Sequence, residues 1–138
     1  MKASSKNHIN KHWLVFANAK RCDHYKSLVE TRFISWKKER NNFAIGDIVY
    51  IFSSKERKII FKTIVADVEE RADSKYWIEN APKELTWRLE AIQEYTGLAL
   101  DEVSLKKHGF KGGRSLQRPM CNNPELFEYI ENQFDILS

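Results

Sequence analysis

Two apolar segments joined by a short charged connection constrain the fold of this chain most strongly. Residues 48–52 (IVYIF) and 59–68 are rich in Ile, Val, Phe and Tyr, which are enriched in β-strands. Residues 55–58 (KERK) between them are polar and few enough for a hairpin connection. The sequence therefore predicts two antiparallel strands at the centre of the structure.

Short strands and short helices are expected on both sides of this hairpin. Residues 12–17 (HWLVFA) are typical of a buried strand, and the apolar residues at 85, 87, 89 and 91 alternate with polar ones, as in a half-buried strand. Asp23 can cap a helix that extends to about Thr31, and Asp101 can cap a short helix over residues 102–108. Asn123 and Pro124 begin a carboxy-terminal helix, whose apolar stripe lies at residues 126, 127, 130 and 134.

The chain of 138 residues suits one core, and no linker rich in Gly, Pro or Ser divides it. We expect a flexible amino-terminal segment over residues 1–11 and a single domain over residues 12–138. Strands interleaved with short helices predict an α+β fold, built on a small curled sheet or barrel of mixed strands.

The sequence argues against several classes of protein. No apolar run is long enough to cross a bilayer, and the first residues lack a signal-peptide core, so we expect a cytoplasmic protein. Cys22, His24, His108 and Cys121 could ligate zinc, but their spacing matches no zinc module, so no metal or cofactor is expected. The chain contains no GxGxxG, GxxxxGK[ST], GxSxG or HExxH pattern, and we expect no catalytic residues.

Charge is unevenly distributed along the chain. Residues 1–62 hold 14 Lys and Arg against 5 Asp and Glu, and residues 103–122 hold 5 basic and no acidic residues. If these two basic blocks meet on one face, they form a surface that attracts phosphates, which makes nucleic acid the expected partner. The alternative is that these lysines and arginines are simply solvated.

Two of the four tryptophans lie in polar surroundings. Trp13 and Trp87 belong to strand-like patterns and are expected in the core, whereas Trp36 precedes a basic run and Trp77 lies in an acidic stretch. A tryptophan pair beside basic residues can stack on a flipped or single-stranded base while the cations hold its phosphates.

The hairpin segment resembles a known family. Ser35-Trp36, residues 46–54 (GDIVYIFSS) and residues 58–62 (KIIFK) are similar to the EVE domain and to the related YTH domain, both PUA-like. The resemblance implies a small β-barrel flanked by helices that binds nucleic acid carrying a modified base, such as methylcytosine. It also implies a role in modification-dependent restriction, with a separate nuclease chain as a partner for any cutting.

The resemblance implies a base pocket, and the two basic blocks supply an expected phosphate-binding set. The base pocket is expected to contain Trp36, Trp77, Asn18, Ser35, Ser53 and Ser54. The phosphate-binding set is Lys20, Arg21, Lys37, Lys38, Arg114 and Arg118. Two alternatives remain, an ASCH-type enzyme that acts on RNA or modified nucleosides, and a protein-interaction module.

Overall fold

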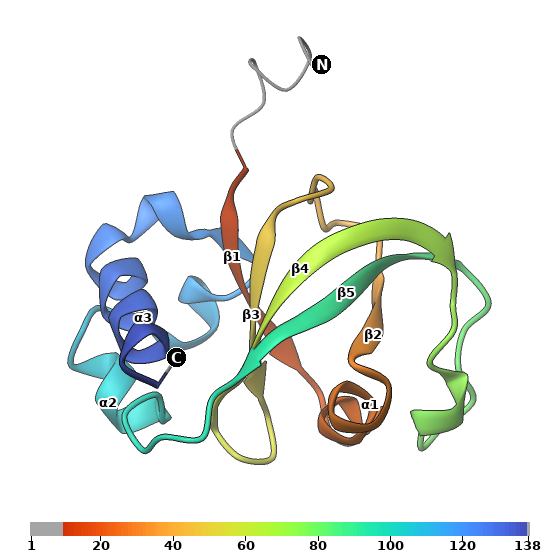
Figure 1. Ribbon diagram of the computed structural model, residues 1–138, viewed down its shortest axis with the longest axis horizontal. Helices are drawn as coiled ribbons and strands as arrows, with labels where there is room; N and C mark the ends of the chain where they lie inside the picture. Colours follow the sequence, from red (N-terminus) through yellow and green to blue (C-terminus); the bar gives the residue numbers. More distant parts are fainter. Residues whose placement is uncertain (1–9, 138) are drawn as a thin grey trace, which may run out of the picture.

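The computed structural model describes residues 10–137, which form a mixed sheet of six strands with short helices beside it (Figure 1). The strand order in the sheet is β2-β5-β4-β3-β1-β6. The strands are β1 (His12–Ala17), β2 (Phe33–Lys37), β3 (Ile48–Ser53), β4 (Lys58–Glu70), β5 (Leu85–Glu94) and β6 (Arg118–Pro119). The α-helices are α1 (His24–Thr31), α2 (Glu102–Lys106) and α3 (Pro124–Leu137). The 3-10 helices are η2 (Ser74–Tyr76), η3 (Gly112–Ser115) and η4 (Met120–Asn122).

The central hairpin and the alternating strand are confirmed. β3 pairs antiparallel with β4, from Ile48 opposite Ile64 to Ser53 opposite Lys58. β5 pairs antiparallel with both β4 and β2, and the α+β class is therefore confirmed. The expected flexible segment falls mostly on residues 1–9, outside the described residues. Lys11 is held in place, since its N–H donates to Asp47 and its carbonyl accepts from Ile48.

The sheet curls on itself because the pairing of β4 is irregular. Its register shifts opposite β3 between Ile51 and Phe52, and shifts twice opposite β5, after Lys62 and after Val65. Such bulges bend a strand and increase its twist. The edge strand β2 is thereby brought round toward β1 (Figure 1).

The curled sheet is not closed into a barrel, which corrects that part of the expected fold. Among the described residues, β2 pairs only with β5, and the other edge is the two-residue strand β6. A side-chain hydrogen bond joins the two sides instead, from Gln117 Nε2 to Asn41 Oδ1 at 2.9 Å. β6 is too short to offer β2 a backbone ladder, so the gap is bridged by side chains.

The inside of the curl holds the first hydrophobic core. Trp13 of β1, Phe43 and Trp87 of β5 lie in a row across it, with ring centroids 5.2 Å and 6.0 Å apart. Trp13 and Trp87 are 7% and 9% exposed, as expected for core residues. The row connects strands from opposite sides of the sheet and stabilises the curl through buried aromatic area.

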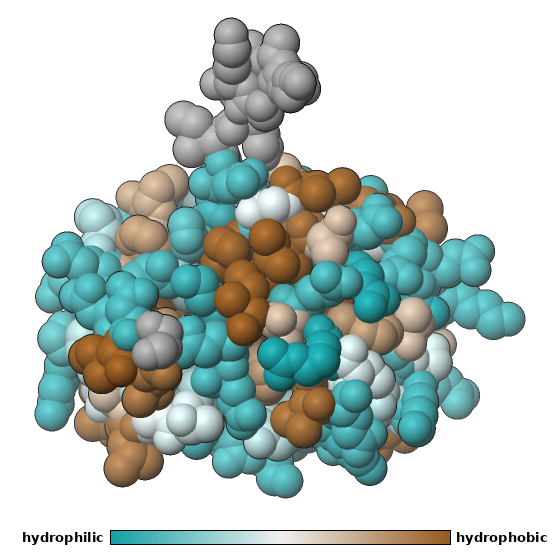
Figure 2. Space-filling model, in the orientation of Figure 1, coloured by the Kyte–Doolittle hydropathy of each residue, from teal (hydrophilic) through white to brown (hydrophobic). Residues whose placement is uncertain are grey.

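The second core lies between the outer face of the sheet and the helices. α3 packs Leu126, Ile130 and Phe134 against this face. The hydroxyl of Tyr50 and the ammonium of Lys62 both donate to Glu131 of α3. In the orientation of Figure 2, apolar side chains gather over the middle of β3, β4 and β5, which the helices leave uncovered.

The predicted helices are confirmed together with their caps. The Asp23 carboxylate accepts from the N–H of Lys26 at the start of α1, and Asp101 accepts from Ser104 at the start of α2. α1 ends at Arg32, whose φ of 66° is left-handed. Within residues 10–137, no helix has the length and apolar character needed to cross a membrane.

Candidate functional site

The parallel pairing of β1 and β3 brings two distant turns together. Ala17 lies opposite Ser53, so both strands end at the same edge of the sheet. The N–H of Ser54 donates to the carbonyl of Ala17 at 2.9 Å, and the N–H of Ala19 donates to the hydroxyl of Ser54 at 2.8 Å. In open parallel sheets, ligands commonly bind at the carboxyl ends of the strands, and β1 and β3 form the parallel pair among the described strands of this sheet. It is found at the bottom of Figure 1, between the β3–β4 connection and α1.

A positively charged depression of about 500 Å³ lies at this edge, and we call it the cationic hollow. It is lined by Phe16, Asn18, Ala19, Lys20, Ser54, Lys55 and Arg57. The structure thus brings together three residues predicted from the sequence, Asn18, Lys20 and Ser54. Ser53, a fourth, lies beside them at the end of β3.

The cations of this hollow differ in how they are used. Arg57 binds Glu102 through two hydrogen bonds, of 3.2 Å and 2.8 Å, and its guanidinium lies 5.3 Å from the ring centroid of Phe52. Lys20 and Lys55 form no ion pair with any described residue and are exposed. Two lysines are therefore free to bind an anion, while Arg57 serves the fold.

A smaller cavity of about 130 Å³ adjoins the hollow, and we call it the inner cavity. Ala19 and Lys55 line both spaces, so the two are neighbours. The other polar residues around it are Asp23, His24, Tyr25, Ser53 and Glu56. Ser53, the last residue of β3, is only 6% exposed.

His24 has an unusual environment. Its Nδ1 atom is enclosed and has no hydrogen-bond partner among the described residues. Burial lowers the pKa of His24 from 6.5 to about 4, outweighing the opposing effect of nearby Asp73, so the imidazole is neutral at pH 7. Behind it, the Trp36 ring lies 5.6 Å away between centroids.

Trp36 lies in the core and not on an open pocket wall. Side chains alternate along β2, so Trp36 faces the inside of the curl together with Ile34, and it is 8% exposed. The structure does not bring Trp36 and Trp77 to the two sides of one cavity. The basic run after Trp36 made its surroundings look polar, but the strand turns the ring inward.

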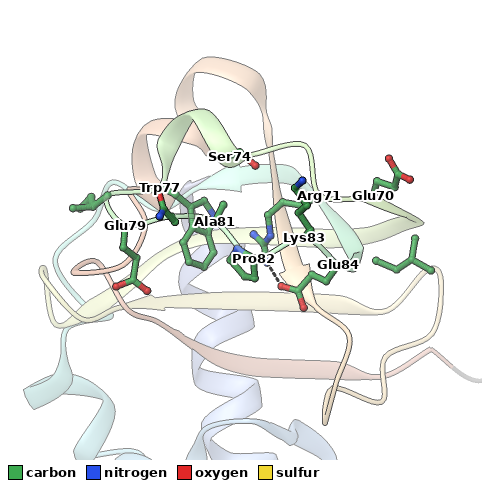
Figure 3. A pocket seen from close by; sticks show the side chains of 12 residues that line it. Glu70, Arg71, Ser74, Trp77, Glu79, Ala81, Pro82, Lys83 and Glu84 are labelled. Atoms are coloured by element: carbon green, nitrogen blue, oxygen red, sulfur yellow. Dashed lines mark hydrogen bonds and ion pairs between the residues drawn. The ribbon is translucent and has the colours of Figure 1, made fainter.

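Trp77 belongs to a separate cluster around Asp73. The Asp73 carboxylate accepts from Trp77 Nε1 at 3.2 Å, from Arg71 at 2.8 Å and from the backbone N–H of Ser35 at 3.1 Å. Arg71 also lies over the Trp77 ring, 4.6 Å from its centroid, and binds Glu84 (Figure 3). Ser35 is used by the fold as well, since its hydroxyl accepts from Ala72.

An open depression of about 1110 Å³ lies against this cluster and is lined by residues 70–71, 74 and 77–85. Glu70, Glu79 and Glu84 make its surface mainly acidic (Figure 3). Its basic lining residues are Lys83 and Arg71, and Arg71 is already bound to Asp73 and Glu84. Such a surface is unsuited to phosphate, so it is the weaker candidate for a nucleic-acid contact.

The remaining predicted phosphate-binding residues do not join the cationic hollow. Arg21 lies near Glu79 at 3.7 Å, and Lys37 near Glu39 at 3.9 Å. Lys38 lies over the Trp87 ring at 4.9 Å. Arg114 and Arg118 line another depression, of about 380 Å³, beside the start of α3. The basic residues thus form several groups and not one continuous face.

Sequence reasoning missed Phe16, His24, Lys55 and Arg57 at this site. Lys55 and Arg57 were assigned only to a hairpin connection, and His24 was considered only as a possible zinc ligand. Only the register between β1 and β3 reveals their proximity. Of the described residues, no group of three or more His, Cys, Asp or Glu side chains could hold a metal ion.

Comparisons with known proteins add no further assignment. No family model, no curated protein and no solved structure matches this chain.

Proposed function

We propose that this chain is a non-catalytic nucleic-acid-binding domain whose cationic hollow holds the backbone of a strand. The observation that carries the proposal is the meeting of Lys20, Lys55, Asn18 and Ser54 at one edge of the sheet. Two unpaired lysines attract a phosphate, and the amide and hydroxyl groups beside them can donate or accept hydrogen bonds. A base attached to that phosphate would enter the adjoining inner cavity.

The fold is compatible with the proposed family. A curled sheet with helices beside it supports a PUA-like domain of the EVE type, with a base extruded from its strand as the ligand. The resemblance of residues 46–54 and 58–62 to that family supports a modified base as the preferred target. An effector such as a nuclease would then be supplied by another chain.

The proposal can be tested by fluorescence polarisation with short labelled oligonucleotides. Single-stranded DNA, single-stranded RNA and duplex DNA are each compared with and without one methylated base. Saturable binding is expected, with log Kd rising linearly with log salt concentration, by about 0.7–0.9 per neutralised phosphate. Tighter binding of the methylated member of any pair supports recognition of a modified base.

Charge reversal locates the interface. The double variant Lys20→Glu with Lys55→Glu removes both unpaired cations of the hollow. It should weaken binding to all oligonucleotides, because phosphate contacts position a strand without specifying its sequence. Lys83→Glu and Lys75→Glu together make the same change of charge near the acidic depression and should leave binding intact. The proposal would be overturned if the Lys20→Glu, Lys55→Glu variant bound oligonucleotides as tightly as the parent, or if the protein cleaved or modified the oligonucleotide.

A further inference from the structure

Among the described residues that line the cationic hollow, Phe16 is the one with an aromatic ring. It lies near the end of β1, in a stretch from Trp13 to Ala17 that is otherwise buried, yet Phe16 itself is only half-buried. Its ring packs at the margin of the second core. The part of the ring that faces the hollow is apolar surface that the core leaves to a ligand.

The Phe16 ring is held in place by the fold. Phe16 lies opposite Phe52 in the parallel pair, and the two rings are stacked, with centroids 6.2 Å apart and planes 23° apart. Phe52 is fully buried, so it provides a fixed support. The backbone N–H of Phe16 is also bound, since it donates to Gln117 at 2.9 Å. A ring ordered in advance loses little conformational entropy when a ligand packs against it.

The guanidinium of Arg57 lies near the Phe16 ring but is not stacked on it. It is 5.9 Å from the ring centroid, at the outer limit of a cation–π contact, and two hydrogen bonds hold it to Glu102. On the other side of the sheet, Arg88 shows the alternative, since its guanidinium lies 3.9 Å from the centroid of Phe33. Arg57 therefore does not take the place of a stacked ring on Phe16.

An open aromatic ring beside unpaired lysines is the arrangement that binds single strands. Lysines hold the phosphates and the ring stacks on a base, and every base has a π-face, so the contact tolerates any sequence. Lys20 and Lys55 are the unpaired cations of the hollow. The acidic side chains nearby are Glu56, which lines the inner cavity, and Glu102, which is bound to Arg57. In a duplex the base faces are already stacked on one another, so such a ring can reach them only in a single strand.

We propose that Phe16 is a stacking platform for a base of a single-stranded nucleic acid whose phosphates lie at Lys20 and Lys55. This inference rests on the proposed function. It adds to that function the class of ligand, a single strand and not a duplex, and the residue that contacts a base next to the one directed at the inner cavity.

The test uses fluorescent oligo-dT and a strand of abasic sugar–phosphate units of the same length and charge. Phe16→Leu keeps an apolar side chain against the second core but removes the ring face. Its affinity for oligo-dT should fall by about 5-fold or more, the lower end of the value of one stacked base. Its affinity for the abasic strand should match that of the parent. The salt dependence should also be unchanged, because no charge has been altered.

A second variant and a matched control complete the design. Phe16→Trp keeps an aromatic face and should bind oligo-dT at least as tightly as the parent. The fluorescence of the added tryptophan should be quenched by oligo-dT and not by the abasic strand, a direct reading of stacking that remains if Phe16→Leu melts early. Phe127→Leu makes the same substitution at another half-buried ring of the second core, outside the hollow, and should bind like the parent.

The possible failures separate the two proposals. Unchanged affinity of Phe16→Leu for oligo-dT, an equal loss for the abasic strand, or no added quenching in Phe16→Trp overturns this inference while the proposed function stands. Tighter binding of the parent to duplex DNA than to oligo-dT does the same. A parent protein that binds no nucleic acid overturns the proposed function itself.

Discussion

Gln117 and Asn41 join the two sides of the curled sheet through a hydrogen bond of 2.9 Å between their side chains. Gln117 also accepts from the N–H of Phe16 at 2.9 Å, so the same side chain holds β1 at the cationic hollow. The bond takes the place of the backbone pairing that would close a barrel. Gln117 thus contributes both to the stability of the curled sheet and to the shape of the cationic hollow.

Replacing Gln117 by Ala should lower the free energy of unfolding by about 1 kcal/mol, the usual value for an exposed neutral hydrogen-bond network. Urea denaturation of Gln117→Ala, Asn41→Ala and the double variant gives the coupling between the two side chains. A positive coupling of about 0.5 kcal/mol or more is expected. Strictly additive losses would show that the two side chains act independently. Asn132→Ala, an exposed position on α3, is the control.

Asp73→Asn should be strongly destabilising. The carboxylate is fully buried and accepts from Arg71, whose side chain is only 4% exposed, so neutralising it leaves a buried cation with Glu84 as its main partner. A loss of about 3 kcal/mol is expected, at the lower end for breaking a buried pair. Asp67→Asn, the same change at an exposed residue of β4, should cost less than about 0.5 kcal/mol. Similar losses in both variants would contradict the role of the Asp73 cluster.

Acid should destabilise the protein through His24. Its pKa is 6.5 in the unfolded chain and about 4 in the folded one, so the unfolded state takes up the proton first as the pH falls. Stability is therefore fully present above pH 6.5 and is lost progressively toward pH 4, by up to about 3 kcal/mol. His12, whose pKa is also lowered by burial, adds a smaller contribution of the same sign.

The difference between the parent and His24→Gln isolates this contribution. Denaturation curves collected from pH 7 to pH 4 should show a flatter pH dependence for the variant. Parallel curves for the two proteins would mean that His24 is not the group responsible. His108→Gln provides the matched control, since His108 is stacked on Tyr129 away from the inner cavity.

Trp36→Ala should mainly lower the free energy of unfolding, and should affect binding only as a consequence. The ring is part of the inner core, so its removal should cost about 3–5 kcal/mol of unfolding free energy, measured by urea denaturation. Leu98→Ala, at a residue that is 92% exposed, should have almost no effect. A Trp36→Ala protein that keeps the stability of the parent but loses oligonucleotide binding would instead give Trp36 a direct stacking role.

Local patterns were sufficient to predict most elements of this fold, but not the two edge strands β2 and β6. The β-branched and aromatic residues around residues 48–68 specify the hairpin, and Asp23 and Asp101 specify helix starts. The closed barrel was not borne out, because closure depends on how much backbone the edge strands present. β6 offers only two residues, which no pattern in its sequence could indicate.

The candidate site was predicted only in part. Asn18, Lys20, Ser53 and Ser54 follow strong strands, and ends of strands are visible in the sequence. Trp36 was assigned to a pocket because its neighbours are charged, yet alternation along β2 places it in the core. The proximity of His24 to Ser53 depends on long-range packing, which a single sequence does not reveal.

The pairing of β1 also determines when the site can form during folding. Its partners are β3, which follows after α1 and β2, and β6, where Pro119 pairs with Trp13 near the far end of the chain. Both pairings close long loops, so they are made late and slowly compared with the local β3–β4 hairpin. The cationic hollow needs the ends of β1 and β3 side by side, so it forms only after β1 has joined a hairpin that can fold without it.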